Sequence, residues 1–200
     1  PHGGVWVGTT EKGVRYFQDG VWHNWSEWGG VASTGVRSLF IASNGDLWVA
    51  PDFGVLLYRV RNRQVQAVTN SVSPDALRPL AASLPSAIRA LAESADGTIW
   101  AGTDDGQVLK VRDLKLISEP AIEQSPPLSV CSLLATRDGS LWIGYAGDGL
   151  GHFKDGRYQR LKTQAGLADD FTAQLLADDT DHLWLAGNRG LSRVRFAELD

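Results

Sequence analysis

The stretch GTIWAGT at residues 97–103 occurs five times along the chain in recognisably the same form. The other copies are GGVWVGT at 3–9, GDLWVAP at 45–51, GSLWIGY at 139–145 and DHLWLAG at 181–187. Each copy has an apolar residue directly before its tryptophan and a small residue two positions after it. The tryptophans follow one another at intervals of 42, 52, 42 and 42 residues: Trp6, Trp48, Trp100, Trp142 and Trp184. A near-constant interval of this length is the mark of a repeat architecture, so the repeat decides the fold.

Each repeat has the pattern of four short strands joined by tight turns. In the third repeat the strands are expected at 87–93, 98–102, 107–111 and 114–118. The pair Asp96-Gly97 between the first two strands favours the positive φ of a tight hairpin. Equivalent pairs stand at 44–45 and 138–139, but the fifth repeat has Thr180-Asp181 without a glycine, so a different turn type is expected there. Helical periodicity is absent throughout, which predicts an all-β protein.

Four strands in a unit of about 42 residues predict a β-propeller, whose units (blades) run to roughly 40–50 residues. A four-stranded sheet cannot bury both of its faces alone, so blades stack face to face. The repeat tryptophan supplies apolar area between neighbouring blades, and the small residue leaves space where blades converge. The five repeat tryptophans are therefore interpreted as structural.

The repeats are expected at about 1–30, 31–72, 83–124, 125–166 and 167–200, with an insertion at about 71–85, all within one propeller segment spanning 1–200. The first begins at its tryptophan strand and the fifth ends after its third strand, so three blades are complete and two have three strands. We expect this to be part of a larger propeller. Closure as an imperfect five-blade ring, or through another copy of the chain, is the alternative.

Composition excludes several classes of protein. With 19 basic and 23 acidic side chains the net charge is −4, which argues against a nucleic-acid binder. The longest apolar runs are too short for a membrane span in this segment. The four histidines have no metal-ligand spacing, and 178–181 lacks the glycine and glutamate of a calcium loop, so we expect no metal, cofactor or catalytic residue. The single cysteine, Cys131, is expected to be a buried, inert thiol, and the lack of methionine indicates an excerpt of a longer protein.

Longer phrases carry a family resemblance. VRSLFIASNGDLWVA at 36–50, LLATRDGSLWIGYAGDGLGHFKDG at 133–156 and the linker TQAGLADD at 163–170 resemble the two-component regulator propeller repeat. That repeat occurs in the extracytoplasmic sensor regions of bacterial signalling proteins. The resemblance implies a non-enzymatic, ligand-sensing segment in the periplasmic part of an inner-membrane protein. It also implies a parent protein with a histidine kinase or cyclic-dinucleotide synthase as its output domain.

A ligand is expected at one end of the propeller axis, on the loops between second and third strands and the loops between blades. The charged residues expected on these loops are Asp52, Arg78, Asp104, Asp105, Asp148 and Arg189. They would form a polar mouth suited to an oligosaccharide or another small polar molecule, although a merely solvated rim is the alternative for each. Trp28, between the first two blades, either stacks on a sugar ring or packs locally, and the roles of Trp22 and Trp25 stay open.

Two other functions are considered. The first is an enzyme propeller resembling streptogramin lyases, which would need a histidine and acidic residues converging at the axis. The second is a scaffold for protein partners. The sequence does not supply an evident constellation for the enzyme.

Overall fold

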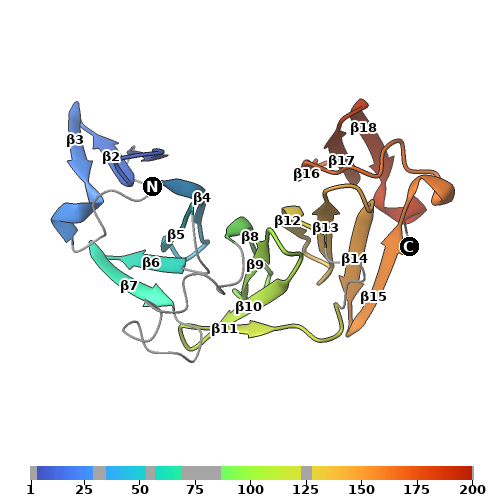
Figure 1. Cartoon of the computed structure of the whole chain (residues 1–200), viewed down its shortest axis with the longest axis horizontal. Coiled ribbons are helices and arrows are strands. Elements are labelled where there is room, and N and C mark those ends of the chain that lie inside the picture. Colours follow the sequence, from blue (N-terminus) through green and yellow to red (C-terminus); the bar gives the residue numbers. More distant parts are fainter. Residues whose placement is uncertain (1–3, 29–34, 53–56, 69–86, 123–127, 200) are drawn as a thin grey trace. The chain divides into compact units, whose positions relative to one another are not determined.

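The computed structural model describes residues 4–28, 35–52, 57–68, 87–122 and 128–199. In these ranges the chain forms five antiparallel sheets that follow one another along the sequence (Figure 1). Three sheets have four strands, and the first and fifth have three. The predicted all-β architecture of three complete and two three-stranded blades is therefore confirmed.

The first sheet consists of β1 (Val5–Gly8), β2 (Val14–Gln18) and β3 (Val21–Asn24). The second consists of β4 (Val36–Ile41), β5 (Leu47–Pro51), β6 (Leu57–Arg61) and β7 (Gln64–Val68). The third consists of β8 (Ile88–Glu93), β9 (Ile99–Thr103), β10 (Val108–Arg112) and β11 (Lys115–Ser118). The fourth consists of β12 (Val130–Ala135), β13 (Leu141–Tyr145), β14 (Leu150–Lys154) and β15 (Arg157–Leu161). The fifth consists of β16 (Gln174–Ala177), β17 (His182–Gly187) and β18 (Gly190–Arg195). Short 3-10 turns are η1 (Trp25–Trp28), η3 (Thr163–Ala165) and η4 (Phe196–Glu198).

The chain divides into two compact units, residues 1–88 with 112–116 and residues 89–111 with 117–200. The first unit holds the first two sheets, and the second holds the fourth, the fifth and most of the third. Each unit has its own apolar core between successive sheets. In the third repeat every strand lies within one residue of its expected bounds.

Within each unit the same interface joins one sheet to the next. The face that carries the repeat tryptophan packs against the two residues that flank the tryptophan of the following sheet. The apolar clusters group Trp6 with Leu47 and Val49, Trp100 with Leu141 and Ile143, and Trp142 with Leu183 and Leu185. The structural role predicted for these tryptophans follows from this packing.

The small residue two positions after the tryptophan lets the sheets approach closely. A Cβ added to Gly102 would lie 2.3 Å from a methyl of Val130, the first residue of the next sheet's inner strand. At Gly8 the added Cβ would lie 2.8 Å from Val36, which holds the same place in the second sheet. Such distances are well inside van der Waals contact, so a larger residue would push the sheets apart.

The turn before the tryptophan strand of the fifth sheet has the positive φ and the closing hydrogen bond of the turns in the second, third and fourth sheets, which corrects the expectation of a different type. Gly45, Gly97 and Gly139 have φ of 84°, 82° and 86°, and Asp181 in the equivalent place has φ of 64°. The backbone N–H of Asp178 donates to the carbonyl of His182 at 3.0 Å and closes the turn. Aspartate tolerates the left-handed conformation better than most residues, so it replaces glycine here without changing the turn.

The same turn supplies a partner for the tryptophan ring in some sheets. The indole Nε1–H donates to Ser94 Oγ at 2.5 Å in the third sheet and to Asp178 Oδ2 at 2.8 Å in the fifth. Both acceptors stand six residues before their tryptophan. In the second sheet that place is Ala42, and Trp48 Nε1 is buried without a hydrogen-bond partner among the described residues. The missing acceptor is a local defect that one substitution can repair.

We expect Ala42→Ser to raise the free energy of unfolding by about 1 kcal/mol, because the new hydroxyl would accept from the buried Trp48 indole as Ser94 does from Trp100. Urea unfolding of the variant and of wild type measures the difference. Ala42→Cys is the control, since a thiol of similar size is a weak acceptor. Equal stabilisation by serine and cysteine would mean that filled space, and not the hydrogen bond, is responsible.

Candidate functional site

The loop after each tryptophan-bearing strand lies against the segment that leads into the first strand of the following sheet. In the first unit the N–H of Val36 donates to the carbonyl of Thr9 at 2.9 Å, and in the second unit Thr172 donates to Tyr145 at 2.9 Å. We call these segments, taken within each unit separately, the loop rim of that unit. The rim comprises residues 9–13, 35 and 52 of the first unit and 104–107, 128–129, 146–149, 162–173 and 188–189 of the second.

Two rim segments of the second unit and the start of strand β8 bring together Asp104, Ser129 and Arg89. Arg89 stands at the start of β8, and its Nη1 lies 3.3 Å from Asp104 Oδ1 and 3.2 Å from Ser129 Oγ. The Ser129 hydroxyl lies 3.4 Å from the same carboxylate oxygen. The side chains of Arg89 and Asp104 are 39% and 28% exposed. A guanidinium, a carboxylate and a hydroxyl therefore converge where solvent can reach them.

The same ion pair occurs in the first unit. Arg37 Nε lies 3.7 Å from Asp52 Oδ1, and both side chains are 36% exposed. In both sheets the arginine stands 11 residues before the repeat tryptophan and the aspartate 4 residues after it. In the fourth and fifth sheets the corresponding residues are uncharged: Cys131 with Ala146, and Ala173 with Asn188. Sequence reasoning selected Asp52 and Asp104 but missed the two arginines, which their fixed distance from the tryptophan could have revealed.

Cys131, in the arginine's place in the fourth sheet, is partly buried. Burial raises the pKa of its thiol, with a smaller lowering by Arg89 and a raising by Asp104. The residue therefore stays a thiol at neutral pH, as an unreactive cysteine does.

Asp148 occupies a closed ion cluster instead of an open mouth. Its carboxylate, 10% exposed, pairs with the guanidinium of Arg160 and the ammonium of Lys162. The Arg160 guanidinium lies 4.8 Å from the centre of the Tyr145 ring, and its Nε donates to Tyr158 Oη at 3.0 Å. Burial raises the pKa of both tyrosines, so they stay neutral. The charge of Asp148 is thus paired with Arg160 of β15 and with Lys162 directly after it.

The other predicted ligand residues have different surroundings. Asp105 accepts hydrogen bonds from Thr103 Oγ1 and Gln107 Nε2, both in its own loop. Trp28 lies half-buried in η1, where its ring centre is 5.6 Å from that of Trp6. Arg78 lies outside the described residues. Of the candidates, Asp52 and Asp104 remain the two that face solvent beside an arginine on the loop rim.

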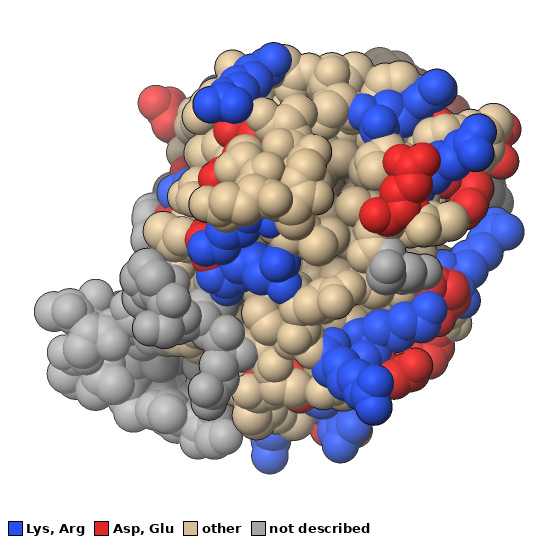
Figure 2. Space-filling view, turned by 90° about the vertical axis from the view of Figure 1, so that its right-hand side faces the viewer, with Lys and Arg blue, Asp and Glu red and all other residues tan. Residues whose placement is uncertain are grey.

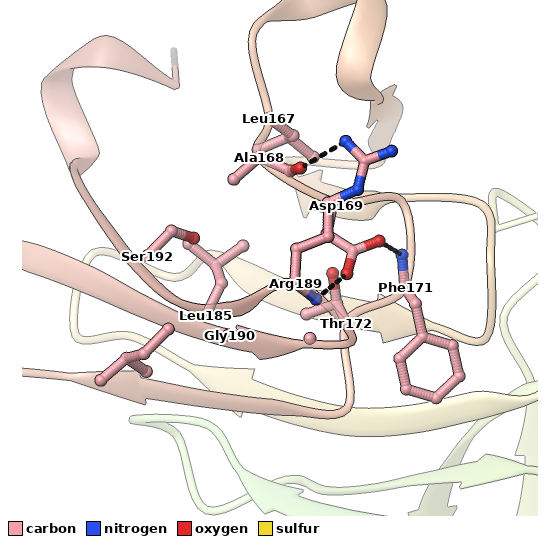
Figure 3. A pocket seen from close by; sticks show the side chains of 11 residues that line it. Leu167, Ala168, Asp169, Phe171, Thr172, Leu185, Arg189, Gly190 and Ser192 are labelled. Atoms are coloured by element: carbon pink, nitrogen blue, oxygen red, sulfur yellow. Dashed lines mark hydrogen bonds between the residues drawn. The ribbon is translucent and has the colours of Figure 1, made fainter.

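Arg189 and Asp169 form a clamp over a small cavity in the fifth sheet (Figure 3). Asp169 Oδ1 accepts the N–H of Phe171 at 3.0 Å and Oδ2 accepts the N–H of Arg189 at 2.8 Å. The Arg189 guanidinium donates to the carbonyl of Ala168 at 3.3 Å. The cavity of about 40 Å³ suits ordered water but is far below the volume of a small-molecule site, which runs to roughly 300–1,000 Å³. Arg189 therefore joins the loop between β17 and β18 to the segment before β16 by hydrogen bonds.

Asp169 makes the clamp sensitive to acid. Backbone hydrogen bonds from Phe171 and Arg189 hold the pKa of its carboxyl below the ordinary value. A depressed pKa contributes stability above the unfolded-state value of roughly 4, and this stability is lost as pH falls through the folded-state pKa. We expect Asp169→Asn to speed hydrogen exchange of the Arg189 N–H at pH 7, with the difference from wild type vanishing in acid.

Hydrogen exchange followed by NMR over a pH series checks this expectation. Asp155→Asn, in the exposed turn after β14, is the matched control and should leave the Arg189 N–H unchanged. A difference between Asp169→Asn and wild type that persists unchanged in acid would show that carboxylate charge is not what holds the loop.

Each of the three described histidines contacts side chains near it in the sequence or on the paired strand. His152 is buried and stacks on Trp142 with ring centres 4.0 Å apart. Ser140 Oγ donates to Asp138 Oδ2 at 2.8 Å and lies 3.0 Å from His152 Nε2, so that nitrogen must carry a proton and donate. The Gln159 amide Nε2 donates a hydrogen bond to the other ring nitrogen, His152 Nδ1, at 3.1 Å. A histidine that donates to a serine cannot also remove its proton.

His23 pairs with Glu27 in the first sheet at 3.7 Å, and His182 lies 3.7 Å from Asp178 at the turn before the fifth tryptophan. Neither belongs to the loop rim. In the part of the chain that the structure describes, no group of three or more metal-ligating side chains gathers. On the face in Figure 2, basic and acidic side chains lie interspersed with uncharged ones.

Comparison with known proteins shows which repeat and which fold this chain resembles. Residues 83–105, which include Arg89 and Asp104, match the model of the two component regulator propeller. The sequence resemblance to that repeat is thereby confirmed. A search of curated proteins gave no significant match. Among the described residues, none of the helices has the length and apolar character needed to cross a membrane.

Three solved structures illustrate the fold. The extracellular domain of BT4673 from B. thetaiotaomicron, assigned as a one component or hybrid two component system, matches 98% of this chain with a TM-score of 0.76 and 18% identity. PorZ, a surface component of the type-IX secretion system of Porphyromonas gingivalis, matches 96% with a TM-score of 0.71 and 20% identity. Virginiamycin B lyase from Staphylococcus aureus matches 97% with a TM-score of 0.71 and 15% identity.

The chain spans 26% of the length of the BT4673 domain, 30% of PorZ and 67% of the lyase. At these identities the likeness establishes the β-propeller fold alone. Propellers of sensors and of lyases are both among the similar structures.

Proposed function

We propose that this chain is a non-enzymatic segment of an extracytoplasmic sensor propeller and that its loop rim binds a small polar ligand, with a carbohydrate as the first class to test. The observation that carries the proposal is the exposed cluster of Arg89, Asp104 and Ser129. This cluster lies at the boundary of two sheets, and two of its members fall within the residues that match the two-component regulator repeat.

The chemistry of the cluster fits a hydroxyl-rich ligand. A sugar hydroxyl can donate to the Asp104 carboxylate and accept from the Arg89 guanidinium at the same time. The two side chains are partly exposed, so their ion pair can open toward a ligand without burying an unpaired charge. The pair Arg37 and Asp52 offers the same chemistry in the first unit.

The sensor role rests on the proteins in which similar repeats occur. The matched family description names two component regulators, and BT4673 is an extracellular domain of such a signalling system. In the parent protein, ligand at the rim would change how the propeller packs on its partner and so bias a histidine kinase or cyclic-dinucleotide synthase. We place the segment in the periplasm, as part of an inner-membrane protein.

Isothermal titration of the purified chain against neutral, uronate-containing and sulfated oligosaccharides tests the binding. We expect saturable binding of at least one of the three classes, weakened roughly tenfold or more by Arg89→Ala, because a charge-assisted hydrogen bond is lost. Arg137→Ala is the matched control, since Arg137 is exposed on a turn between first and second strands, away from the loop rim. Failure of all three oligosaccharide classes to bind, or equal weakening by both variants, would reject the rim as their site.

The enzyme alternative has one observation in its favour, the likeness to virginiamycin B lyase. A structure of that lyase with quinupristin used a histidine-to-alanine variant described as catalytically inactive. In this chain the described histidines lie away from the loop rim, and His152 is fully engaged in hydrogen bonds. Sensing is therefore the better-supported function.

A further inference from the structure

A cleft opens between the fourth and fifth sheets, at the end of β13 that lies opposite the loop rim. The turns before β13 and β17 and the residues directly after β18 line it. Its volume of about 840 Å³ falls within the roughly 300–1,000 Å³ of small-molecule sites. The two sheets pack on each other through Trp142 and Phe196, among other residues. The cleft is therefore bounded by neighbouring sheets of one unit and does not lie on an outer sheet face.

The wall of the cleft contains a hydrogen-bond donor that is not in use. In the third and fifth sheets the indole N–H of the tryptophan donates to the side chain six positions before it. In the fourth sheet that position is Thr136, which lines the cleft and whose hydroxyl donates to Asp138 Oδ1 at 2.6 Å. Trp142 also lines the cleft, is only 2% exposed, and its Nε1 has no hydrogen-bond partner among the described residues. Buried donors without a partner are rare in folded proteins, so this N–H is available to an acceptor that enters the cleft.

The cleft also has carboxylates to spare. Four aspartates line it: Asp138, Asp178, Asp179 and Asp181. Asp138 Oδ2 pairs with Lys154 Nζ at 2.6 Å, and both oxygens of Asp178 accept hydrogen bonds within the fifth sheet. Asp179 and Asp181 are exposed, and their carboxylates make no hydrogen bond or ion pair with the part of the chain that the structure describes. Two of the four carboxylates can therefore accept from a ligand.

The balance of charge and apolar surface favours an organic cation. Among the described residues that line the cleft, Arg137 is the only basic one, so the carboxylates outnumber the cations even when Lys154 is included. The rest of the lining is apolar, with three alanines and the Phe196 ring beside Trp142. Such a wall contacts the carbon atoms of an organic molecule, whereas a magnesium or calcium ion needs oxygen ligands around it.

We infer that this cleft binds a small primary amine that also carries a hydroxyl or carbonyl oxygen. The ammonium group would donate to the carboxylates of Asp179 and Asp181, and the oxygen would accept from the Trp142 indole. Hydrogen bonds between an ammonium and a carboxylate are charge-assisted and roughly twice as strong as neutral ones, so the two aspartates supply most of the affinity. The cleft and the loop rim lie at opposite ends of β13, so the inference does not depend on the rim ligand proposed above.

Isothermal titration with aminodeoxysorbitol and with sorbitol compares one molecular body with and without the ammonium group. We expect the amine to bind saturably and at least roughly tenfold more tightly than sorbitol at pH 7. The double variant Asp179→Asn with Asp181→Asn should weaken the amine by roughly tenfold or more, because asparagine keeps the shape of the side chain and removes its charge. Asparagine also tolerates the positive φ of Asp181. Asp19→Asn is the matched control, since Asp19 is an exposed turn residue of the first unit with φ of 49°, and should bind as wild type does.

The indole N–H signals in a proton–nitrogen NMR correlation spectrum show where the amine binds. The signal of Trp142 should move downfield as its N–H gains an acceptor. The signal of Trp100, whose N–H already donates to Ser94 in the third sheet, should stay in place and serves as the internal reference. Equal binding of the amine and sorbitol would overturn the inference, as would an unchanged affinity in the double variant or a Trp142 signal that does not move at saturation.

Discussion

Replacing Trp142 by alanine is expected to lower the free energy of unfolding by about 4 kcal/mol, because a large ring would be removed from a packed interface between two sheets. Trp142 is only 2% exposed. Its ring stacks on His152 with an interplanar angle of 2°, and its centre lies 5.6 Å from that of the Phe196 ring. The cavity would lie between the fourth and fifth sheets, where neither can collapse without losing its own strand pairing.

Trp184→Ala is the matched control, since Trp184 holds the same repeat position in the fifth sheet and is only partly buried in this chain. Its removal loses the hydrogen bond to Asp178 and the contact with Arg193, but opens little buried space. We expect a cost of about 1 kcal/mol. Urea unfolding of both variants measures the contrast. Equal costs would show that the tryptophan acts within its own sheet and that stacking between sheets contributes little.

The second large effect is expected for Asp148→Asn, which should destabilise the chain by about 3 kcal/mol. The substitution leaves the Arg160 guanidinium, 15% exposed, without its counter-charge in a partly buried site. Breaking a buried pair from one side costs more than the pair contributes, because the remaining charge stays desolvated.

Lys162→Met separates the buried partner from the exposed one. Lys162 is 42% exposed and pairs with the other oxygen of Asp148, so its loss should cost at most about 1 kcal/mol. Chemical denaturation of both variants gives the comparison. An Asp148→Asn variant as stable as wild type would leave the residue free for the ligand role that its loop position predicts.

The repeat made most of the fold predictable. Side chains alternate between the two faces of a strand. The repeat motif, an apolar residue directly before the tryptophan and a small residue two positions after it, therefore specifies which side chains share a face. Gly102 against Val130 shows that this spacing also fixes how closely the next sheet approaches. The turn at Asp181 was mispredicted because residue type alone hides that aspartate accepts a positive φ.

The site was less predictable, because its charges are paired across strands and sheets. The sequence predicts that Asp148 is an acidic loop residue available to a ligand. In the structure the register of β14 with β15 brings Arg160 to its carboxylate. The cluster at Arg89 depends on Ser129, 40 residues further along the chain. Position in a loop predicts exposure, but only the folded register shows which loop charges are already neutralised.

The close approach at the small residue also determines how stability is distributed among the sheets. Because the inner strand of each sheet fits against the sheet before it, much of a sheet's stability within a unit is a coupling to its neighbour and is absent when the sheet stands alone. Such a molecule behaves as a one-dimensional chain of coupled units, in which damage at one interface weakens both adjoining sheets and fades beyond them. Cooperativity is then set interface by interface, and the small residue two positions after each tryptophan, glycine or alanine, sets how closely the two sheets can couple.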